Sequence, residues 1–353
     1  MRIVALECWQ EKLKLLEPYT IAYETIDSAT NVFLRIETDK GINGYGCAAP
    51  DWEVTGETGA TVLAAFQQII EPYLKGKEPF SYALILEELK GLLKNQPSAL
   101  CMVDMALFDL IGKKTQEPVY RLLGGYRDSI PTSVTVGILS VDETLERAKD
   151  FIQQGFFILK IKGGSDIEVD IERIMKLREM VGPEMEIRFD ANQGYTVAQA
   201  VDFMHKIRSA NIELLEQPTH KENDNLLKQV SNQVSVPVMA DESLMTLKDV
   251  FHLTSNNCTD MINIKLMKAG GIMEAMRINA VAKAANVETM VGCMDESSMG
   301  IAAGLHFALA RPNILYADLD GHFDLIDDPF ASMVKCKKGI LYPSTRPGFG
   351  WER

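Results

Sequence analysis

The chain has 353 residues, with 36 Lys and Arg against 49 Asp and Glu, and a formal net charge of −13. Nucleic acids and anionic membrane surfaces repel such an acidic protein, so neither is expected as its main partner. Hydrophobic residues make up 46% of the chain and charged residues 24%. These are globular proportions, and a chain of this length builds a core without disulfides or a structural metal.

The six cysteines are scattered, and no two of them form a CxxC pair. Single cysteines in a chain of this size are typical of buried thiols in a reducing compartment. Arg2, Glu7 and Gln10 interrupt the apolar run that a signal peptide would need. No stretch approaches the roughly 18 apolar residues of a membrane span. We therefore expect a cytoplasmic protein.

Residues 1–125 have the pattern of an α+β domain. Segments 32–37 and 41–46 predict a hairpin that turns at Asp39-Lys40-Gly41. Helical spacing of apolar residues follows in three segments, at 62–74, 81–93 and 99–114. The proline-containing tail, residues 322–353, is expected to pack back on this domain. The prediction is an α+β capping domain made from both ends of the chain.

From about residue 130, short apolar runs alternate with amphipathic helical stretches. The predicted strands lie at 132–138, 157–162, 186–190, 212–216, 236–240, 261–265, 287–291 and 314–318. Helices are expected between them, for example at 141–154, 166–181 and 272–285. Continuous apolar strands are typical of sheets that are buried on both faces. Eight βα units favour a (β/α)8-type barrel over residues 126–321, with an open doubly wound sheet as the alternative.

Ionisable residues gather at the C-terminal ends of six predicted strands, where barrel active sites form. They are Lys160, Lys162, Asp190, Glu216, Asp241, Lys265, Asp318 and Asp320. An isolated acid at a strand end usually caps a helix or faces solvent. Six strands with the same feature predict one common site at the barrel mouth.

Three of the carboxylates predict a metal site. Asp190, Glu216 and Asp241 are 26 and 25 residues apart, which is about one βα unit each. They should therefore stand on three adjacent strands, where they repel one another unless a cation neutralises them. Oxygen ligands without Cys or His select a hard ion, so we expect Mg²⁺, with Mn²⁺ as an alternative occupant. The alternative is that the three carboxylates are unrelated helix caps.

The lysines suggest acid–base chemistry. Lys160 and Lys162 are two residues apart on one strand, so their side chains share a face. Repulsion between the two ammonium groups, together with a nearby dication, is expected to lower the pKa of one of them. A lysine with a lowered pKa is a competent base near neutral pH. Lys265 should lie four strands further on, across the barrel mouth. A lysine on one side of the substrate could then remove a proton, and a lysine on the other side could return one. Lys268 competes for that role, but 263–265 still has a strand pattern.

Asp318 and Asp320 also share a face, far in sequence from the metal triad. A second acidic pair needs a positive partner, either a substrate ammonium or a second cation. A loop that closes the barrel beside Gly321 explains the pair equally well at this point.

These motifs, in this order and spacing, resemble the enolase superfamily in its muconate-lactonising branch. The matching motifs are Lys160-Ile161-Lys162, Asp190-Ala191-Asn192, Glu216-Gln217-Pro218, Asp241-Glu242-Ser243 and Asn263-Ile264-Lys265. Residues 104–113 and 122–125 resemble the family's cap helix and its junction to the barrel. The resemblance covers nearly the whole chain. It implies the capped barrel and a Mg²⁺ ion held by the three carboxylates.

Asp318-Leu319-Asp320 resembles the DxD motif of dipeptide epimerases, where both aspartates hold the substrate ammonium. The implied reaction is 1,1-proton transfer at the α-carbon of the C-terminal residue, through an enediolate-like intermediate that Mg²⁺ stabilises. By the same resemblance, Lys162 and Lys265 are the two acid/bases, and Lys160 tunes Lys162. The substrate pocket should include Thr135 and the segment Cys293-Met294-Asp295.

The early loop departs from one family pattern. Members acting on Ala-Glu carry an arginine there, whereas this chain places Glu24 and has no Arg between Lys12 and Thr30. Asp295 stands where an apolar residue is common. We expect a neutral dipeptide, Ala-Xaa with a small apolar Xaa, and a cationic Xaa is the alternative.

Two other classes of function compete with the epimerase. Sister enzymes of the branch, namely an N-acylamino-acid racemase, a succinylbenzoate synthase or a cycloisomerase, would leave the aspartate pair without a role. A non-catalytic binding protein would have no need of the intact lysines and carboxylates. The resemblance is also compatible with a homo-oligomer.

Overall fold

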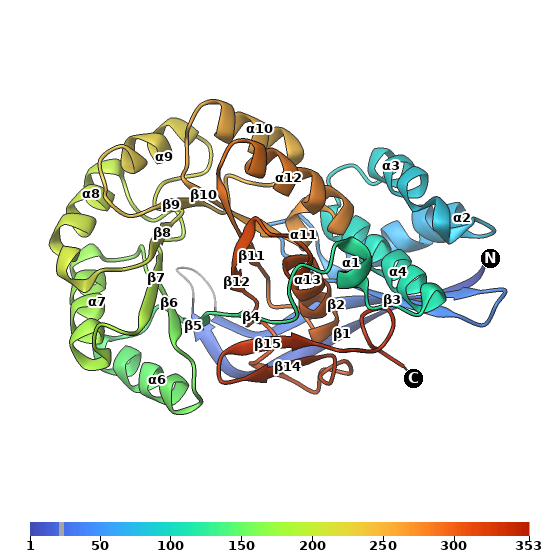
Figure 1. Ribbon diagram of the computed structural model, residues 1–353, viewed down its shortest axis with the longest axis horizontal. Coiled ribbons are helices and arrows are strands. Elements are labelled where there is room, and N and C mark those ends of the chain that lie inside the picture. The colour runs from blue at the N-terminus through green and yellow to red at the C-terminus, as the bar shows by residue number, and fades with distance from the viewer. Residues whose placement is uncertain (21–24, 353) are drawn as a thin grey trace.

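A computed structural model describes residues 1–20 and 25–352 of the chain (Figure 1). Its centre is an eight-stranded parallel sheet with the order β12-β11-β10-β9-β8-β7-β6-β5. The strands are β5 (Val134–Val136), β6 (Ile158–Lys162), β7 (Glu186–Asp190), β8 (Leu214–Glu216), β9 (Val238–Ala240), β10 (Met261–Lys265), β11 (Glu288–Gly292) and β12 (Ile314–Asp318). All eight predicted strands are confirmed, although four of them are shorter than expected.

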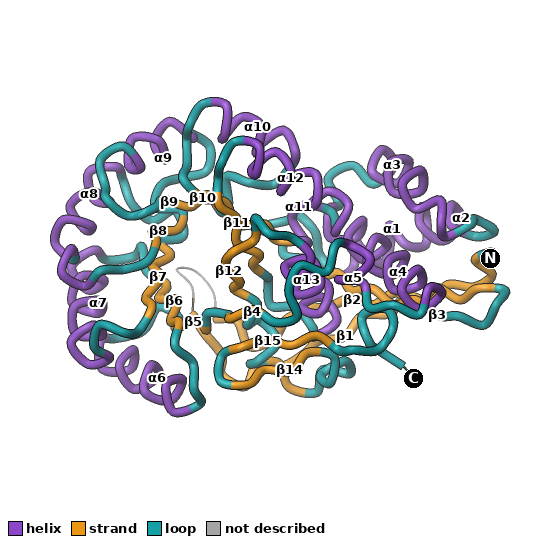
Figure 2. The backbone as a smooth tube through the Cα atoms, in the orientation of Figure 1, coloured by secondary structure: helices purple, strands orange, loops and turns teal. Residues whose placement is uncertain are grey.

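The sheet curls into a barrel rather than staying open. Between the first and last strands, the Ser133 N–H donates to the Ala317 carbonyl at 3.2 Å. Helices form an outer ring around the strands (Figure 2). They are α6 (Val141–Gln153), α7 (Ile167–Val181), α8 (Val197–Lys206), α9 (Asp224–Ser231), α10 (Leu247–Ser255), α12 (Ile272–Ala284) and α13 (Ser298–Ala310), with the short α11 (Leu266–Ala269) and the 3₁₀ turn η3 (Arg208–Ala210) between them. The barrel prediction is confirmed, and the doubly wound alternative is wrong.

The sequence marks where several barrel helices begin. Ser140 caps α6, Thr196 caps α8 and Thr246 caps α10. Each hydroxyl accepts from the backbone N–H three residues on, and that residue's side chain returns a bond to the cap. These capping boxes satisfy N–H groups that a helix cannot pair internally. The helix starts therefore follow from local residue choice.

A second, antiparallel sheet lies beside the barrel, with the order β13-β1-β2-β3. Its strands are β1 (Ile3–Thr20), β2 (Thr25–Thr38), β3 (Asn43–Ala48) and β13 (Leu325–Ile326). The β2–β3 hairpin confirms the turn predicted at residues 39–41. Helical segments α1 (Gly59–Ala65), η1 (Phe66–Ile70), α2 (Glu71–Leu74), η2 (Pro79–Ser81), α3 (Tyr82–Leu92), α4 (Pro97–Thr115) and α5 (Val119–Leu123) complete this region.

Helix α4 packs tightly between this sheet and the barrel. A Cβ atom on Gly46 of β3 would lie 2.0 Å from the Met102 carbonyl, and one on Gly44 would lie 2.3 Å from the Ala106 carbonyl. Only glycine permits this approach of strand to helix. On another face of α4, Asp104 accepts the N–H groups of Ile272 at 2.7 Å and Met273 at 3.0 Å. This buried carboxylate caps α12 and joins the two regions.

The C-terminal tail contacts both regions. Strand β13 pairs with β1, placing Leu325 opposite Leu15. Strands β14 (Val334–Lys337) and β15 (Ile340–Pro343) form a small sheet with β4 (Ile130–Pro131). Further on, the Phe349 N–H donates to Asp109 of α4 at 2.9 Å. The division of the chain near residue 125 stays a prediction. No helix in the described ranges is long and apolar enough to cross a bilayer.

Candidate active site

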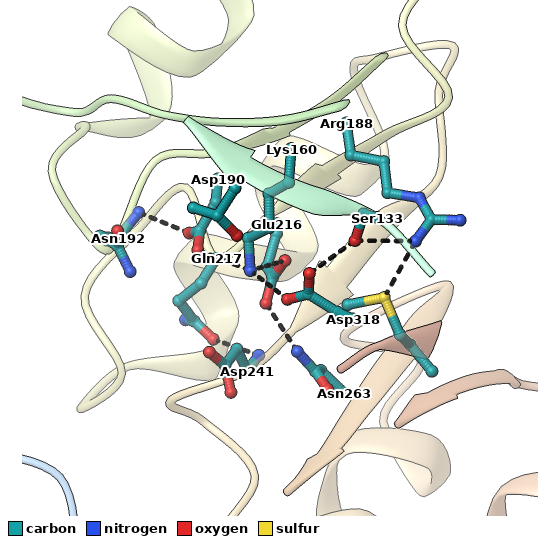
Figure 3. Close-up of polar contacts among 12 residues, drawn as sticks. Ser133, Lys160, Arg188, Asp190, Asn192, Glu216, Gln217, Asp241, Asn263 and Asp318 are labelled. Atoms are coloured by element: carbon teal, nitrogen blue, oxygen red, sulfur yellow. Dashed lines mark hydrogen bonds and ion pairs between the residues drawn. The ribbon is translucent and has the colours of Figure 1, made fainter. Parts of the chain in front are cut away.

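Lys160 lies at the centre of the barrel mouth, and only 2% of its surface is exposed (Figure 3). Its Nζ is 3.1 Å from Asp190 Oδ2, 2.9 Å from Glu216 Oε2 and 2.9 Å from Asp318 Oδ2. Burial opposes a charge here, but the surrounding carboxylates outweigh it and raise the pKa of Lys160 well above its usual value. Three strand ends that are distant in sequence therefore meet on one ammonium group.

Asp241 holds two further lysines. Its Oδ2 is 2.7 Å from Lys265 Nζ, and its Oδ1 is 2.5 Å from Lys268 Nζ. Burial opposes ionisation of Asp241, yet Lys265 and Lys268 hold its pKa far below the usual range. Burial lowers the pKa of Lys268, whereas Asp241 overcomes burial and raises the pKa of Lys265. The pKa of Lys160 is raised, and a lowered pKa within the Lys160–Lys162 pair stays a prediction.

Lys162 is the last residue of β6 and keeps partial exposure. It stands in register with Asp190 on β7. Strand β10, which carries Lys265, lies four strands from β6 in the eight-stranded barrel. Lys162 and Lys265 therefore occupy opposite sides of the mouth, as the sequence predicted.

The donors of the predicted metal triad fit a hard dication, although lysines contact them in this structure. Within residues 1–20 and 25–352, the structure contains no group of three Asp, Glu, His or Cys side chains arranged to hold a metal ion. Glu216 Oε2 is buried and, within these ranges, has only the Lys160 ion pair and no hydrogen bond. Burial and then repulsion from Asp190 and Asp241 raise the pKa of Glu216 to about 8. The three carboxylates offer only oxygen donors, as Mg²⁺ prefers.

The loops after β7 and β8 adopt unusual backbone conformations. Asn192, Gln193 and Gln217 have φ of 41°, 68° and 32°, in the left-handed region that side chains disfavour. Gln217 Oε1 accepts the N–H groups of Asp241 at 2.9 Å and Ser243 at 3.1 Å. Such conformations persist where surrounding bonds hold them, and they gather at functional sites. Here the left-handed residues direct the loops that follow β7 and β8 toward the barrel mouth.

The two aspartates of the DxD motif lie together but have different partners. Asp318 Oδ1 accepts from Ser133 Oγ at 2.5 Å, and its Oδ2 faces Lys160. Burial opposes the charge of Asp318, but Lys160 and Ser133 hold its pKa below the usual value. Asp320 Oδ2 accepts the Thr135 N–H at 2.7 Å, and its Oδ1 is 3.9 Å from Cys293 Sγ.

Asp320 differs from Asp318 because it has no ion pair with a lysine among the described residues. The residue keeps partial exposure. Enclosure by the protein and then repulsion from Asp318 raise the pKa of Asp320 to about 7. It therefore sits in a position that favours a cation beside it. Thr135, Cys293 and Asp320, all predicted for the pocket, are brought together at this point.

The loop after β11 carries Met294 and Asp295 and is anchored by the capping sheet. Asn31 of β2 is fully buried. It donates to the Asp295 carbonyl at 3.2 Å and accepts the Ser297 N–H at 2.8 Å. Glu24, the remaining predicted substrate residue, lies outside the described residues.

The sequence assigned no role to four polar residues of the site, namely Asn31, Ser133, Gln217 and Asn263. Asn263 donates to Glu216 Oε1 at 2.8 Å. It shares a strand face with Lys265, just as Ser133 shares one with Thr135, so the i, i+2 rule could have found both. Asn31 lies on the other domain, and no local pattern marks it.

The chain matches two family models. Residues 143–353 match the family described as enolase C-terminal domain-like. Residues 4–124 match the mandelate racemase / muconate lactonizing enzyme N-terminal domain.

Curated relatives span the whole chain at similar identity. The L-Ala-D/L-Glu epimerase of Bacillus subtilis is 39% identical over 99% of this chain and 96% of its own. The hydrophobic dipeptide epimerase of Enterococcus faecalis is 39% identical over 99% of each chain. The L-Lys-D/L-Arg epimerase of Desulforapulum autotrophicum is 40% identical over 100% of each.

Two solved structures share the fold closely. The substrate-liganded Bacillus subtilis enzyme aligns with a TM-score of 0.96 and 38% identity, covering 99% of this chain and 98% of its own. The Enterococcus faecalis dipeptide epimerase, complexed with Mg and L-Leu-L-Tyr, aligns with a TM-score of 0.94 and 38% identity over 99% of each chain. These similarities cover the capping region and the barrel together.

Proposed function

Because the chain belongs to the enolase superfamily, in its mandelate racemase and muconate-lactonising branch, we propose that it is a Mg²⁺-dependent dipeptide epimerase. The enzyme is an isomerase that inverts the α-carbon of the C-terminal residue of a dipeptide. The observation that carries the proposal is the position of Asp320, a partly exposed aspartate that shares the barrel mouth with two lysines on opposite sides.

In this proposal, Lys162 and Lys265 act as the two acid/bases. Their strands lie on opposite sides of the barrel, so one lysine removes the α-proton and the other returns a proton to the opposite face. Lys160 keeps its proton among Asp190, Glu216 and Asp318 and supplies a fixed positive charge beside Lys162. Asp241 orients Lys265 through their 2.7 Å contact.

Asp190, Glu216 and Asp241 are the residues that would hold Mg²⁺. When bound, the ion would stabilise the negative charge that develops on the substrate carboxylate as the α-proton leaves. The all-oxygen donor set supports this assignment, as does the buried Oε2 of Glu216, which has no hydrogen bond among the described residues. Mn²⁺ has similar ligand preferences and is the alternative ion.

The ammonium group of the dipeptide is assigned to Asp320 and Asp318. Asp320 makes the main contact, because both oxygens of Asp318 already face Ser133 and Lys160. Thr135 orients Asp320 through its backbone N–H. Cys293, Met294 and Asp295 line the pocket on the neighbouring strand end.

The second residue of the dipeptide is proposed to be small and apolar, with a cationic residue as the alternative. The three relatives act on different second residues at nearly equal identity to this chain, so overall identity does not decide between them. The lack of arginine between Lys12 and Thr30 argues against an acidic residue. Asp295 is the feature that favours the cationic alternative.

A dipeptide library incubated with the protein and Mg²⁺ in D₂O tests the proposal. A one-unit gain in mass, with inversion at the C-terminal residue, is the expected result. Exchange of N-succinyl amino acids without exchange of any dipeptide would instead favour a sister racemase. A library of Ala-Xaa dipeptides with apolar, cationic and acidic Xaa resolves the specificity in the same experiment.

The remaining parts of the proposal concern location and assembly. All six cysteines lie among the described residues and are free thiols, which supports a reducing, cytoplasmic location. The net charge of −13 supports a small-molecule substrate rather than nucleic acid. We also propose a homo-oligomer, which sedimentation of the purified protein would test.

A further inference from the structure

Arg173 of α7 is a fully buried charge behind the β6 end of the active site. It retains 1% exposure and lies outside the carboxylate–lysine cluster of the mouth. A buried guanidinium is costly unless its donors are paired. Here each of its three nitrogens has a partner, so the residue is held in one position.

The partners of Arg173 are the ends of two barrel strands. Its NH1 donates to the Lys162 carbonyl at 2.7 Å, and its NH2 donates to the Gly137 carbonyl, just after β5, at 2.6 Å. Its Nε donates to Thr144 Oγ1 on α6 at 2.9 Å. One planar side chain therefore fixes the backbone on which Lys162 stands, relative to the strand beside it and to two helices.

Asp170 extends the same network to the next strand. Its Oδ1 accepts from Arg173 NH1 at 3.1 Å. Its Oδ2 accepts from the Tyr195 hydroxyl at 2.7 Å and from the Gly164 N–H at 2.8 Å. A Cβ atom on Gly163 would lie 2.7 Å from Asp170 Oδ1, so the loop after Lys162 closes directly on this carboxylate.

We propose that Arg173 is a positioning residue for Lys162, acting through the Lys162 and Gly137 carbonyls. The inference rests on the proposed acid/base role of Lys162. Lys265 is held differently, by its side-chain contact with Asp241. Loss of the Arg173 network should therefore impair the proton transfer on the Lys162 side and spare the transfer on the Lys265 side.

The test is Arg173→Lys, followed by α-proton exchange in D₂O from each of the two epimers of one dipeptide. A lysine keeps the charge but has a single nitrogen, so it cannot reach both carbonyls and Thr144 together. Lys162→Ala, measured in parallel, identifies the epimer whose exchange depends on Lys162. We expect Arg173→Lys to slow exchange from that epimer about tenfold or more, because small misplacements of a reacting group have large effects on rate. Exchange from the other epimer should change about twofold at most.

Arg178→Lys is the matched control. Arg178 lies on the same helix and also donates to backbone carbonyls, those of Ala210 and Gly182, each at 2.6 Å. These carbonyls precede β7 and β8, so the bonds lie away from the C-terminal strand ends that form the mouth. The control should lower the melting temperature without separating the two exchange rates.

An equal loss of exchange from both epimers in Arg173→Lys would overturn the inference and leave the proposed function standing. If wild-type protein exchanges no dipeptide, the proposed function fails and the inference fails with it. If Arg173→Lys does not fold, Thr144→Val decides the question by the same measurement. A selective loss there supports the inference, and an equal loss overturns it.

Discussion

Lys160 and Asp318 form a 2.9 Å ion pair inside the barrel mouth, where their exposed fractions are 2% and 5%. The pair lies beside Asp320, which keeps partial exposure. The two aspartates of one short motif therefore differ in availability. Asp318 stabilises a buried lysine, and Asp320 is the one placed to meet a cation from solution.

Asp320→Asn should weaken use of dipeptides with a free ammonium. A hydrogen bond to a charged group contributes about 1.5–3 kcal/mol, so kcat/KM should fall about tenfold to hundredfold. Steady-state kinetics with a dipeptide and its N-acetyl derivative make the comparison, because the derivative has no charge to lose. An equal loss for both substrates would contradict the ammonium assignment.

Asp318→Asn is expected to act on stability as well as on binding. The change removes one of three carboxylates around buried Lys160 and leaves that charge less compensated. Thermal unfolding should show a larger loss for Asp318→Asn than for Asp320→Asn. Unchanged melting of Asp318→Asn would contradict the importance of the Lys160 pair.

The activity should rise with pH through about 7. The pKa of Asp320 is raised to about 7, so below this pH the free enzyme carries a neutral carboxyl that attracts the substrate ammonium weakly. The kcat/KM profile reports this group in the free enzyme. Asp320→Asn should remove this rise from the profile. An unchanged inflection in the variant would assign the titration to another residue.

Lys162→Ala and Lys265→Ala should each abolish epimerisation, because inversion needs a group on both faces of the α-carbon. Each variant should retain α-proton exchange from one epimer only, and the retained epimers should be opposite. NMR in D₂O measures the exchange. Full epimerisation by either variant would contradict the two-base assignment.

Lys268→Met provides the control for the choice of Lys265. Lys268 contacts Asp241 but lies beyond the end of β10. The variant should keep exchange from both epimers, at a reduced rate. One-sided exchange in Lys268→Met, with two-sided exchange in Lys265→Ala, would reverse the assignment.

Removal of divalent ions with EDTA should abolish activity, and Mg²⁺ or Mn²⁺ should restore it. Mg²⁺ should also raise the melting temperature of the wild-type protein, since an ion that binds the folded state stabilises it. Glu216→Gln should reduce that rise. Glu57→Gln is the control, because Glu57 is a buried carboxylate of the capping region that accepts the Ser98 and Ala99 N–H groups. A normal Mg²⁺ response in Glu216→Gln would contradict the metal assignment.

The barrel could be predicted because its signals are local. Buried parallel strands such as 261–265 and 314–318 are short runs that end in one ionisable residue. Strand β1 was not predicted, because Glu7, Glu11 and Lys12 interrupt its apolar pattern. Its 18 residues become a strand through pairing with β2, which is a tertiary effect.

The active site, too, could be predicted only where its signals are local. The charged strand ends follow from the eightfold repeat, and they meet as predicted. The lysine–carboxylate pairings do not follow, because they depend on which side chains reach across the mouth. Asn31 had no signal, since its partners in the barrel loop, Asp295 and Ser297, are 264 and 266 residues away in the sequence.

The bonds from Asn31 to Asp295 and Ser297 have a consequence for protein engineering. A chimaera that combines this barrel with the cap of a relative keeps the side chains of the barrel loop. It loses the hydrogen bonds from Asn31 that hold this loop in place. Substrate preference in this architecture should therefore be transferred by exchanging the cap strand and the barrel loop together. Random mutagenesis confined to the barrel would leave this cap contact unchanged.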